Sequence, residues 1–173
     1  LEVGASIIDF GHEKVSFGLF KNFALVHSIT FPIGVNHIIK DISKVCSLDL
    51  EESKNIVKDF DFSFNTNPKL FDENNYLKNT FFIHSNYRKI SKSLISNVIK
   101  SRIDEIIDIL KKQLIVPRFH SISTISVILT GGGSNLNNIE KYLIETFLPN
   151  VKKVFSEDNN LSSCLGALKI IKN

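Results

Sequence analysis

The stretch Ile125–Ser134, ISVILTGGGS, is the part of the sequence that most directly predicts a fold. Its first five residues are apolar or β-branched for the most part, which is typical of a buried strand. A helical pattern of apolar residues then runs over Leu136–Phe147. Gly131, Gly132 and Gly133 lie between the two, where bare backbone can approach a ligand and point free N–H groups at it. The same glycines also fit a tight strand-to-helix turn, because one glycine turn is no nucleotide fingerprint.

A second glycine signal lies near the N-terminus, between two predicted strands. Ala5–Phe10 is a short apolar run, and Val15–Leu19 alternates as a half-buried strand does. Asp9 and Gly11 would therefore lie in a hairpin that could hold a hydrated Mg²⁺ ion and a phosphate. A polar hairpin tip without a ligand is the competing interpretation, since Glu13 would repel a phosphate.

The next segments predict one more strand and two helices. A two-residue turn at Lys21–Asn22 leads into a strand over Phe23–Thr30. Asn36 is placed to cap the helix that follows. Asp49 and Glu52 resemble a capping pair at the head of a second helix, whose acidic first turn complements the helix dipole.

The longest predicted helix covers Tyr87–Leu114 and carries an apolar stripe on one side. The stripe consists of Ile90, Leu94, Val98, Ile103, Ile106 and Leu110. A strand over Val151–Phe155 and a closing helix over Leu161–Ile171 end the chain. This order of elements predicts an α/β fold in which helices pack on a mixed sheet.

Composition narrows the classes of function. A chain of 173 residues with 43% hydrophobic and 23% charged residues suits one folded domain. The 21 basic and 18 acidic side chains are scattered, so we predict no nucleic-acid partner. No apolar run of about 18 residues exists to cross a membrane. Because the sequence contains no Met, we expect it to be a piece of a longer protein.

The residues that usually carry chemistry show no catalytic or metal-binding pattern. No serine lies in a G-x-S-x-G elbow, and the five histidines lack the spacing of a zinc site. Cys46 and Cys164 fall in unrelated segments. We therefore predict no catalytic residue and no metal ligand, and a reducing cytosol as the compartment.

The order of the predicted elements, together with four short sequence motifs, resembles one protein family. The hairpin with Asp9 and Gly11 is followed by His27–Ser43, HSITFPIGVNHIIKDIS, by Leu50–Ser53, LEES, and by Leu129–Ser134, LTGGGS. These stretches are similar to the second lobe of FtsA, the actin-like bacterial cell-division protein. The two glycine-containing stretches recur across actins, Hsp70 chaperones and sugar kinases. The stretch His27–Ser43 is more specific to FtsA. The resemblance runs through nearly the whole chain and would cover about half of a family member.

The resemblance implies an actin-like (RNase H-like) lobe with a mixed five-stranded sheet and flanking helices. It also implies a small inserted α+β subdomain at residues 49–87, between core segments 1–48 and 88–173. Family members bind ATP, with Mg, between two lobes and form filaments. They join the FtsZ ring to the inner face of the cell membrane at the division septum through a C-terminal amphipathic helix, which we do not expect within these 173 residues.

The resemblance further implies a nucleotide site formed by the two glycine-containing stretches and one helix. Asp9 and Gly11 would form the phosphate hairpin, and Gly131 to Gly133 the turn beside the adenosine. The helix with Glu52 and Lys54 would lie beside the base. The usual hairpin has a further Gly and a Thr where Glu13 and Lys14 stand here. At most a weak ATPase is expected of the full-length parent, and none of this chain alone.

The resemblance also implies a partner site on the longest helix. In the family the FtsZ C-terminal tail uses a basic and an acidic residue that correspond to Arg102 and Glu105. Residues three apart share a helix face, so Arg102 could bind a tail carboxylate while Glu105 accepts from an N–H or a lysine. An ordinary solvated ion pair is the competing interpretation. Lys89 and Lys92 could extend the basic surface.

Two other functions remain open on sequence grounds. The chain could be the C-terminal half of a sugar-kinase-like phosphotransferase, whose catalytic base would lie in the missing lobe. It could also belong to an actin-like pilus-assembly or shape protein, which keeps the fold and replaces the FtsZ contact.

Overall fold

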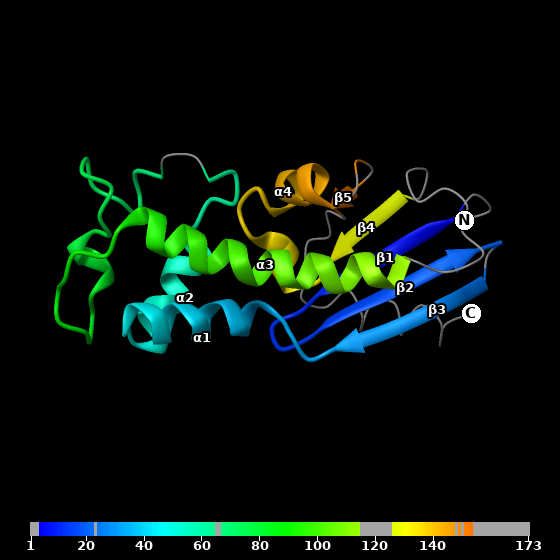
Figure 1. Cartoon of the computed structure of the whole chain (residues 1–173), viewed down its shortest axis with the longest axis horizontal. Helices are drawn as coiled ribbons and strands as arrows, with labels where there is room; N and C mark the ends of the chain where they lie inside the picture. The colour runs from blue at the N-terminus through cyan, green and yellow to red at the C-terminus, as the bar shows by residue number, and fades with distance from the viewer. Residues whose placement is uncertain are drawn as a thin grey trace, which may run out of the picture.

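The computed structural model describes residues 4–22, 24–64, 67–114, 126–147, 149 and 151–153. Its centre is a five-stranded mixed sheet with strand order β3-β2-β1-β4-β5 (Figure 1). The strands are β1 (Ala5–Phe10), β2 (Val15–Lys21), β3 (Ala24–Phe31), β4 (Ser126–Thr130) and β5 (Val151–Lys153). The first three form an antiparallel meander, and β4 pairs in parallel with both β1 and β5. The predicted α/β fold with a mixed five-stranded sheet is confirmed.

Small shifts separate the predicted strand ends from the observed ones. Lys21 pairs with Ala24, so Lys21 belongs to β2 and the turn begins one residue later, at Asn22. Asn22 has φ 49°, a left-handed conformation that asparagine tolerates well. Thr130 pairs with Asp9 and thereby extends β4 one residue beyond the predicted end.

Two helices follow the meander, and one predicted cap is wrong. Helix α1 (Val35–Cys46) is capped by Gly34, whose N–H donates to Nδ1 of His37 at 3.1 Å. Asn36 therefore lies inside the first turn and does not cap the helix. Helix α2 (Leu50–Asp59) begins as predicted, with Asp49 as its cap.

Helix α3 (Lys92–Leu114) is the longest helix, but it begins later than predicted. Tyr76 forms a bridge with Ser91, and the N–H of Leu77 donates to the carbonyl of Ile90 at 2.8 Å, so the residues just before α3 are extended. The predicted stripe is also partly wrong, since Leu94 is 40% exposed. The buried stripe consists of Ile95, Ile99, Ile103, Ile106, Ile107 and Leu110.

Helix α3 connects two parts of an elongated molecule (Figure 1). Its C-terminal half lies across the sheet, where Ile103, Ile106 and Leu110 pack against Ile8 and Leu129. Its N-terminal half extends past the sheet and lies beside α1, which in turn packs against α2 (Figure 1). The buried side chains of both parts form one continuous hydrophobic core.

The later part of the segment 60–91 forms the end of the molecule far from the sheet (Figure 1), whereas Asp61, near its start, forms a bridge with Asn137. The described residues of this segment contain a 3₁₀ helix at Asn79–Phe81 and isolated bridges, but no regular strand. Single bridges therefore take the place of regular strands among these residues. Arg88 fastens the segment to α1, because its guanidinium donates to the carbonyls of Cys46 and Ser47 at the helix C-terminus. An independent subdomain at 49–87 stays a prediction.

The region after β4 differs in detail from the expected strand, turn and helix. A 3₁₀ helix at Gly132–Asn135 follows the first glycine, and helix α4 covers Ile139–Thr146. Asn138, with φ 61°, precedes α4. The glycines therefore do not form the N-terminus of an α-helix. The predicted closing helix, Leu161–Ile171, lies outside the described residues.

Candidate functional site

The two glycine signals meet at one edge of the sheet. β1 and β4 are parallel neighbours, and Asp9 pairs with Thr130 at their C-terminal ends. A Cβ atom added at Gly131 would lie 2.3 Å from Oδ1 of Asp9 and 2.7 Å from the carbonyl oxygen of Phe10. Such a close approach requires glycine, and Gly131 also has φ 85°. The predicted meeting of the aspartate hairpin and the glycine turn is confirmed.

The hairpin between β1 and β2 is held by the start of α1. Within the hairpin, the N–H of Gly11 donates to the carbonyl of Lys14 at 3.0 Å. The carbonyls of Gly11 and His12 accept from the N–H groups of Val35 (3.2 Å) and Asn36 (2.8 Å). The hairpin therefore satisfies two of the free N–H groups at the N-terminus of α1.

A carboxylate occupies the tip of this hairpin. Glu13 is exposed, and its Oε1 accepts from Nδ2 of Asn36 at 2.6 Å. His12 lies 3.7 Å from the same oxygen. The negative charge of Glu13 disfavours a phosphate at this tip.

A cavity of about 450 Å³ opens between the hairpin, α1, α2 and the glycine turn. Gly132 and His12 line it from the sheet side, and Lys54, Lys58 and Glu51 from α2. Lys54 and Gly132, both expected beside a nucleotide, thus line the same cavity. Its basic side chains outnumber its acidic ones, which suits an anionic ligand.

Glu52, in contrast, points into the protein and does not line this cavity. Its side chain is fully buried, and Oε1 accepts from the backbone N–H groups of Ile83 (2.6 Å), His84 (2.7 Å) and Ser85 (2.8 Å). Oε2 accepts from the N–H of Asp49 at 2.8 Å and from Oγ of Ser85 at 2.5 Å. Its expected place beside the base is corrected: the carboxylate is used to join two segments of the chain, and Glu51 takes the cavity position.

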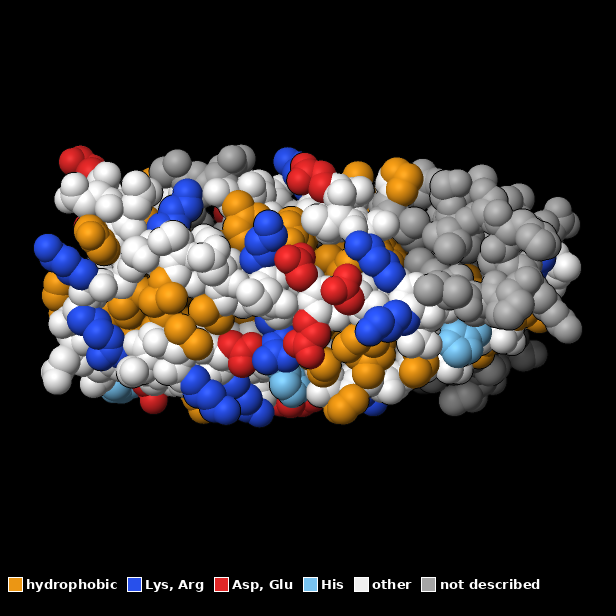
Figure 2. All heavy atoms as spheres, viewed as in Figure 1, with side chains coloured by type: hydrophobic (Ala, Val, Ile, Leu, Met, Phe, Trp, Pro, Cys, Tyr) orange, Lys and Arg blue, Asp and Glu red, His pale blue; other side chains and the backbone are white. Residues whose placement is uncertain are grey.

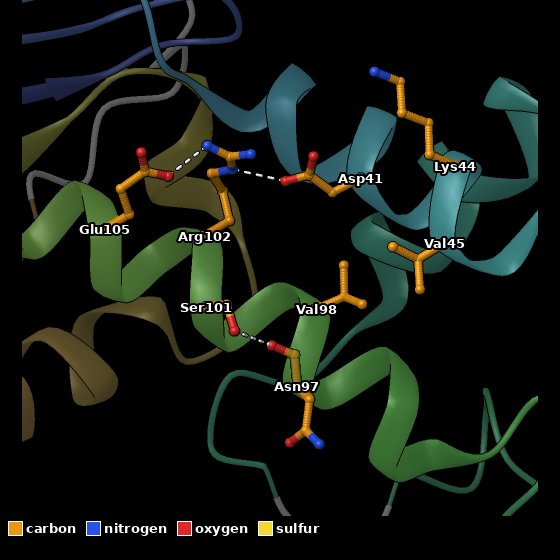
Figure 3. Close-up of a pocket in the computed structure, with 8 residues that line it drawn as sticks. All are labelled: Asp41, Lys44, Val45, Asn97, Val98, Ser101, Arg102 and Glu105. Atoms are coloured by element: carbon orange, nitrogen blue, oxygen red, sulfur yellow. Dashed lines mark hydrogen bonds and ion pairs between the residues drawn. The ribbon is translucent and has the colours of Figure 1, made fainter.

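A groove of about 410 Å³ lies between α1 and α3 (Figure 3). Arg102 and Glu105, the two residues expected to bind a partner, both line it from α3. The α1 wall was not anticipated from the sequence. The groove is lined by Asp41, Lys44 and Val45 of α1 and by Asn97, Val98, Ser101, Arg102 and Glu105 of α3.

The guanidinium of Arg102 bridges two carboxylates in this groove. Nε donates to Oδ2 of Asp41 at 2.6 Å, and a terminal nitrogen donates to Oε2 of Glu105 at 2.5 Å. The hydrogen bond that Arg102 donates to Asp41 is the main cause that raises the pKa of Arg102, so the side chain stays charged. Figure 2 shows acidic and basic side chains together over α1 and α3, beside a hydrophobic patch.

Lys92 does not belong to this groove. It lines a separate polar cavity of about 450 Å³ with Asn74, Tyr76 and Ser96, among other residues. Lys89, the other expected contributor, has its Nζ 5.7 Å from the ring centroid of Tyr76. The structure therefore separates Lys92 from the Arg102 and Glu105 pair, because the cavity and the groove lie on different faces of α3.

Among the described residues, Asp49, Glu51 and His84 form a group with metal-ligand chemistry. One donor atom from each lies within 4.8 Å of the others, and all three are exposed. Asp49 already caps α2, and the positive end of a helix dipole disfavours a cation. We assign no metal to this group.

Comparison with known proteins assigns the sequence to a family. A family model described as Cell division protein FtsA matches residues 6–166. The Cell division protein FtsA of Rhizobium meliloti (strain 1021) is 21% identical over 155 residues, which are 88% of this chain and 34% of that protein. The FtsA of Bacillus subtilis (strain 168) is 22% identical over 152 residues, which are 87% of this chain and 33% of that protein. The chain thus spans about a third of the curated relatives it matches.

Solved structures confirm the actin-like fold. MreB 5 of Spiroplasma citri bound to AMPPNP has a TM-score of 0.70 at 23% identity, over 99% of this chain and 54% of that one. The PilM-PilN type IV pilus biogenesis complex has a TM-score of 0.66 at 16% identity, over 97% of this chain and 46% of that one. At these identities the likeness concerns the fold alone. No helix in the described part of the chain has the length and apolarity that a membrane span needs.

Proposed function

Because this chain belongs to the FtsA family of cell-division proteins, we propose that it is the second lobe of an actin-like scaffold that recruits FtsZ through the groove between α1 and α3. The observation that carries the proposal is the position of Arg102 and Glu105. Both residues line one groove, although the competing interpretation was an isolated surface ion pair. The family match favours this scaffold over a sugar-kinase-like enzyme or a pilus or shape protein.

The groove has the features that a short peptide needs for docking. Arg102 supplies a planar set of N–H donors for a carboxylate, and its side chain is 24% exposed. Val45, which is 52% exposed, and Val98 supply apolar surface beside it. A peptide that combines a carboxylate with an apolar side chain can therefore use both, as helix-groove ligands commonly do.

Replacing Arg102 with alanine is expected to weaken binding of a labelled FtsZ tail peptide by roughly thirtyfold, which corresponds to about 2 kcal/mol for an arginine at the centre of an interface. Lys100→Ala is the matched control, because it removes one exposed cation from the same helix outside the groove. Fluorescence anisotropy measures the affinity, and circular dichroism verifies that each variant is folded. Folded wild-type chain that leaves the peptide unbound would remove the recruitment role.

A second role, half of an ATP-binding cleft with Mg, is supported by the edge of the sheet. Gly131 lies against Asp9, and Lys54 and Gly132 line a cavity of about 450 Å³ beside them. Because the family places the nucleotide between two lobes, the first lobe would supply the remaining contacts of this site. Asp9, Gly11, Gly131, Gly132, Gly133 and Lys54 remain the proposed contacts, and Glu52 does not.

Isothermal calorimetry with Mg-ATP is expected to detect weak or no binding to this chain alone. One lobe cannot enclose a triphosphate, and Glu13 adds a negative charge at the hairpin tip. Micromolar affinity would contradict this expectation. In the full-length parent we propose filament formation, a position at the inner face of the membrane at the septum, and at most a weak ATPase activity.

A further inference from the structure

We propose that Glu105 is a competing carboxylate, which a carboxylate of the partner must displace from Arg102, whereas Asp41 holds Arg102 in place during the exchange. This inference rests on the proposed docking function of the groove and names how the groove selects its ligand. It gives the two carboxylates around Arg102 opposite effects on binding.

The two contacts of Arg102 differ in where they come from and in how accessible they are. Asp41 belongs to α1, its side chain is 27% exposed, and it receives the Nε–H of Arg102. Glu105 belongs to the same helix as Arg102, its side chain is 48% exposed, and it receives a terminal N–H. Glu105 is therefore the carboxylate that solvent and an incoming group can reach and replace.

The charges next to Arg102 favour such an exchange. Asp41 and Glu105 together carry more negative charge than Arg102 alone can neutralise, and Lys44 is the remaining cation among the groove residues. A ligand carboxylate that approaches Arg102 while both carboxylates stay would face like charges at close range. Rotation of the Glu105 side chain into water removes this repulsion and frees terminal N–H donors of the guanidinium.

Asp41 keeps the guanidinium oriented across the groove (Figure 3). In Figure 3, Arg102 extends from α3 toward Asp41 on α1, and the apolar side chains of Val45 and Val98 lie further along the groove. A ligand that pairs with Arg102 therefore meets these valines with its neighbouring side chain. The ligand class that fits is a peptide in which a carboxylate lies close to an apolar side chain.

This assignment reverses the role expected for Glu105 from the sequence. If Glu105 accepted a hydrogen bond from the partner, its removal would weaken binding. If Glu105 competes for Arg102, its removal strengthens binding to an acidic peptide. The sign of the effect therefore distinguishes the two roles.

The test measures the affinity of the labelled FtsZ tail peptide for the wild-type chain and three variants. Glu105→Gln is expected to bind roughly two- to fivefold more tightly, which is the strength of an exposed ion pair. Asp41→Asn is expected to bind about two- to tenfold more weakly, because Arg102 must then be ordered during binding.

Asp108→Asn, which removes an exposed carboxylate of α3 outside the groove, controls for general charge and is expected to leave the affinity within about twofold. Weaker binding by Glu105→Gln, with Asp108→Asn unchanged, overturns the inference but leaves the docking function intact.

A readout without any partner keeps the inference testable if the wild type does not bind the peptide. In ¹⁵N-edited spectra, the Nε–H of Arg102 is expected to exchange slowly with water in the wild type and in Glu105→Gln, and rapidly in Asp41→Asn. Arg102→Lys identifies the signal among the arginines Arg88, Arg102 and Arg118. Fast exchange in Glu105→Gln together with slow exchange in Asp41→Asn overturns the assignment of Asp41 as the positioning residue.

Discussion

Replacing Glu52 with alanine is expected to lower the free energy of unfolding by about 3 to 5 kcal/mol. The carboxylate is fully buried and receives hydrogen bonds from three successive backbone N–H groups, at Ile83, His84 and Ser85. Alanine would leave these part-buried donors without their partner, at a cost of about 1 to 3 kcal/mol for each group that water does not reach. The loop can partly relax toward solvent, so the costs do not add fully.

Urea denaturation followed by circular dichroism measures this effect. Glu51→Ala is the matched control, because it removes a neighbouring glutamate whose side chain is exposed and lies 3.5 Å from His84. Its cost is expected to stay below about 1 kcal/mol, as for other exposed ion pairs. Equal losses in the two variants would show that the buried hydrogen bonds of Glu52 contribute little.

The dependence of stability on pH is a second readout of the same carboxylate. Burial alone would raise the pKa of Glu52, but the hydrogen bonds from Ser85, His84 and Asp49 outweigh burial and lower it to about 2. Because the folded pKa lies below the unfolded one, the stabilisation is present above about pH 4.5 and is lost as the pH falls toward 2, by about 3 kcal/mol in total. The Glu52→Gln variant should lose that part of the pH dependence. An unchanged pH profile in Glu52→Gln would contradict the assignment.

Much of the sheet could be predicted because its sequence signals are local. A short apolar run marks β1, alternating residues mark β2, and an apolar β-branched run marks β4. The close approach of Gly131 to Asp9 could be anticipated as well, since both lie at the ends of strands that resemble neighbours in a known fold. These features depend on residues that are adjacent in sequence or on one motif.

Other features depend on tertiary contacts that periodicity does not encode. In α3, the adjacent pairs Leu94–Ile95 and Val98–Ile99 allow two registers, and packing selects the isoleucines for the core. The start of α3 is set by the bridge between Tyr76 and Ser91. The capping pair at α2 could be predicted, but nothing in the local sequence shows that Glu52 also binds a loop distant in the chain.

The residues of the candidate groove also differ in whether the sequence or only the tertiary structure reveals them. Arg102 and Glu105 were found through a family motif, and their spacing on one helix makes them neighbours. The α1 wall of the groove, with Asp41, Lys44 and Val45, depends on how α1 packs against α3. Val45 gives no distinct signal in the sequence, because its exposure is seen only in the structure and single exposed apolar residues are common on protein surfaces.

Replacing Gly131 with alanine is expected to lower the free energy of unfolding by about 2 to 4 kcal/mol, the combined cost of a left-handed alanine and a close contact. Gly131 has φ 85°, and its added Cβ would lie 2.3 Å from Oδ1 of Asp9. The carbonyl of Phe10, at 2.7 Å, is backbone and cannot move without disturbing β1. Relief of the clash therefore requires the C-terminal ends of β1 and β4 to separate.

Gly132→Ala is the control for this prediction, because Gly132 is exposed and is absent from the glycines with positive φ among the described residues. Its effect on stability is expected to stay within about 1 kcal/mol. Thermal and urea denaturation of both variants give the comparison. Unchanged stability of Gly131→Ala would mean that Gly131 and Asp9 are farther apart than the contacts in the structure indicate. The proposed phosphate site at this edge of the sheet would then lose its support.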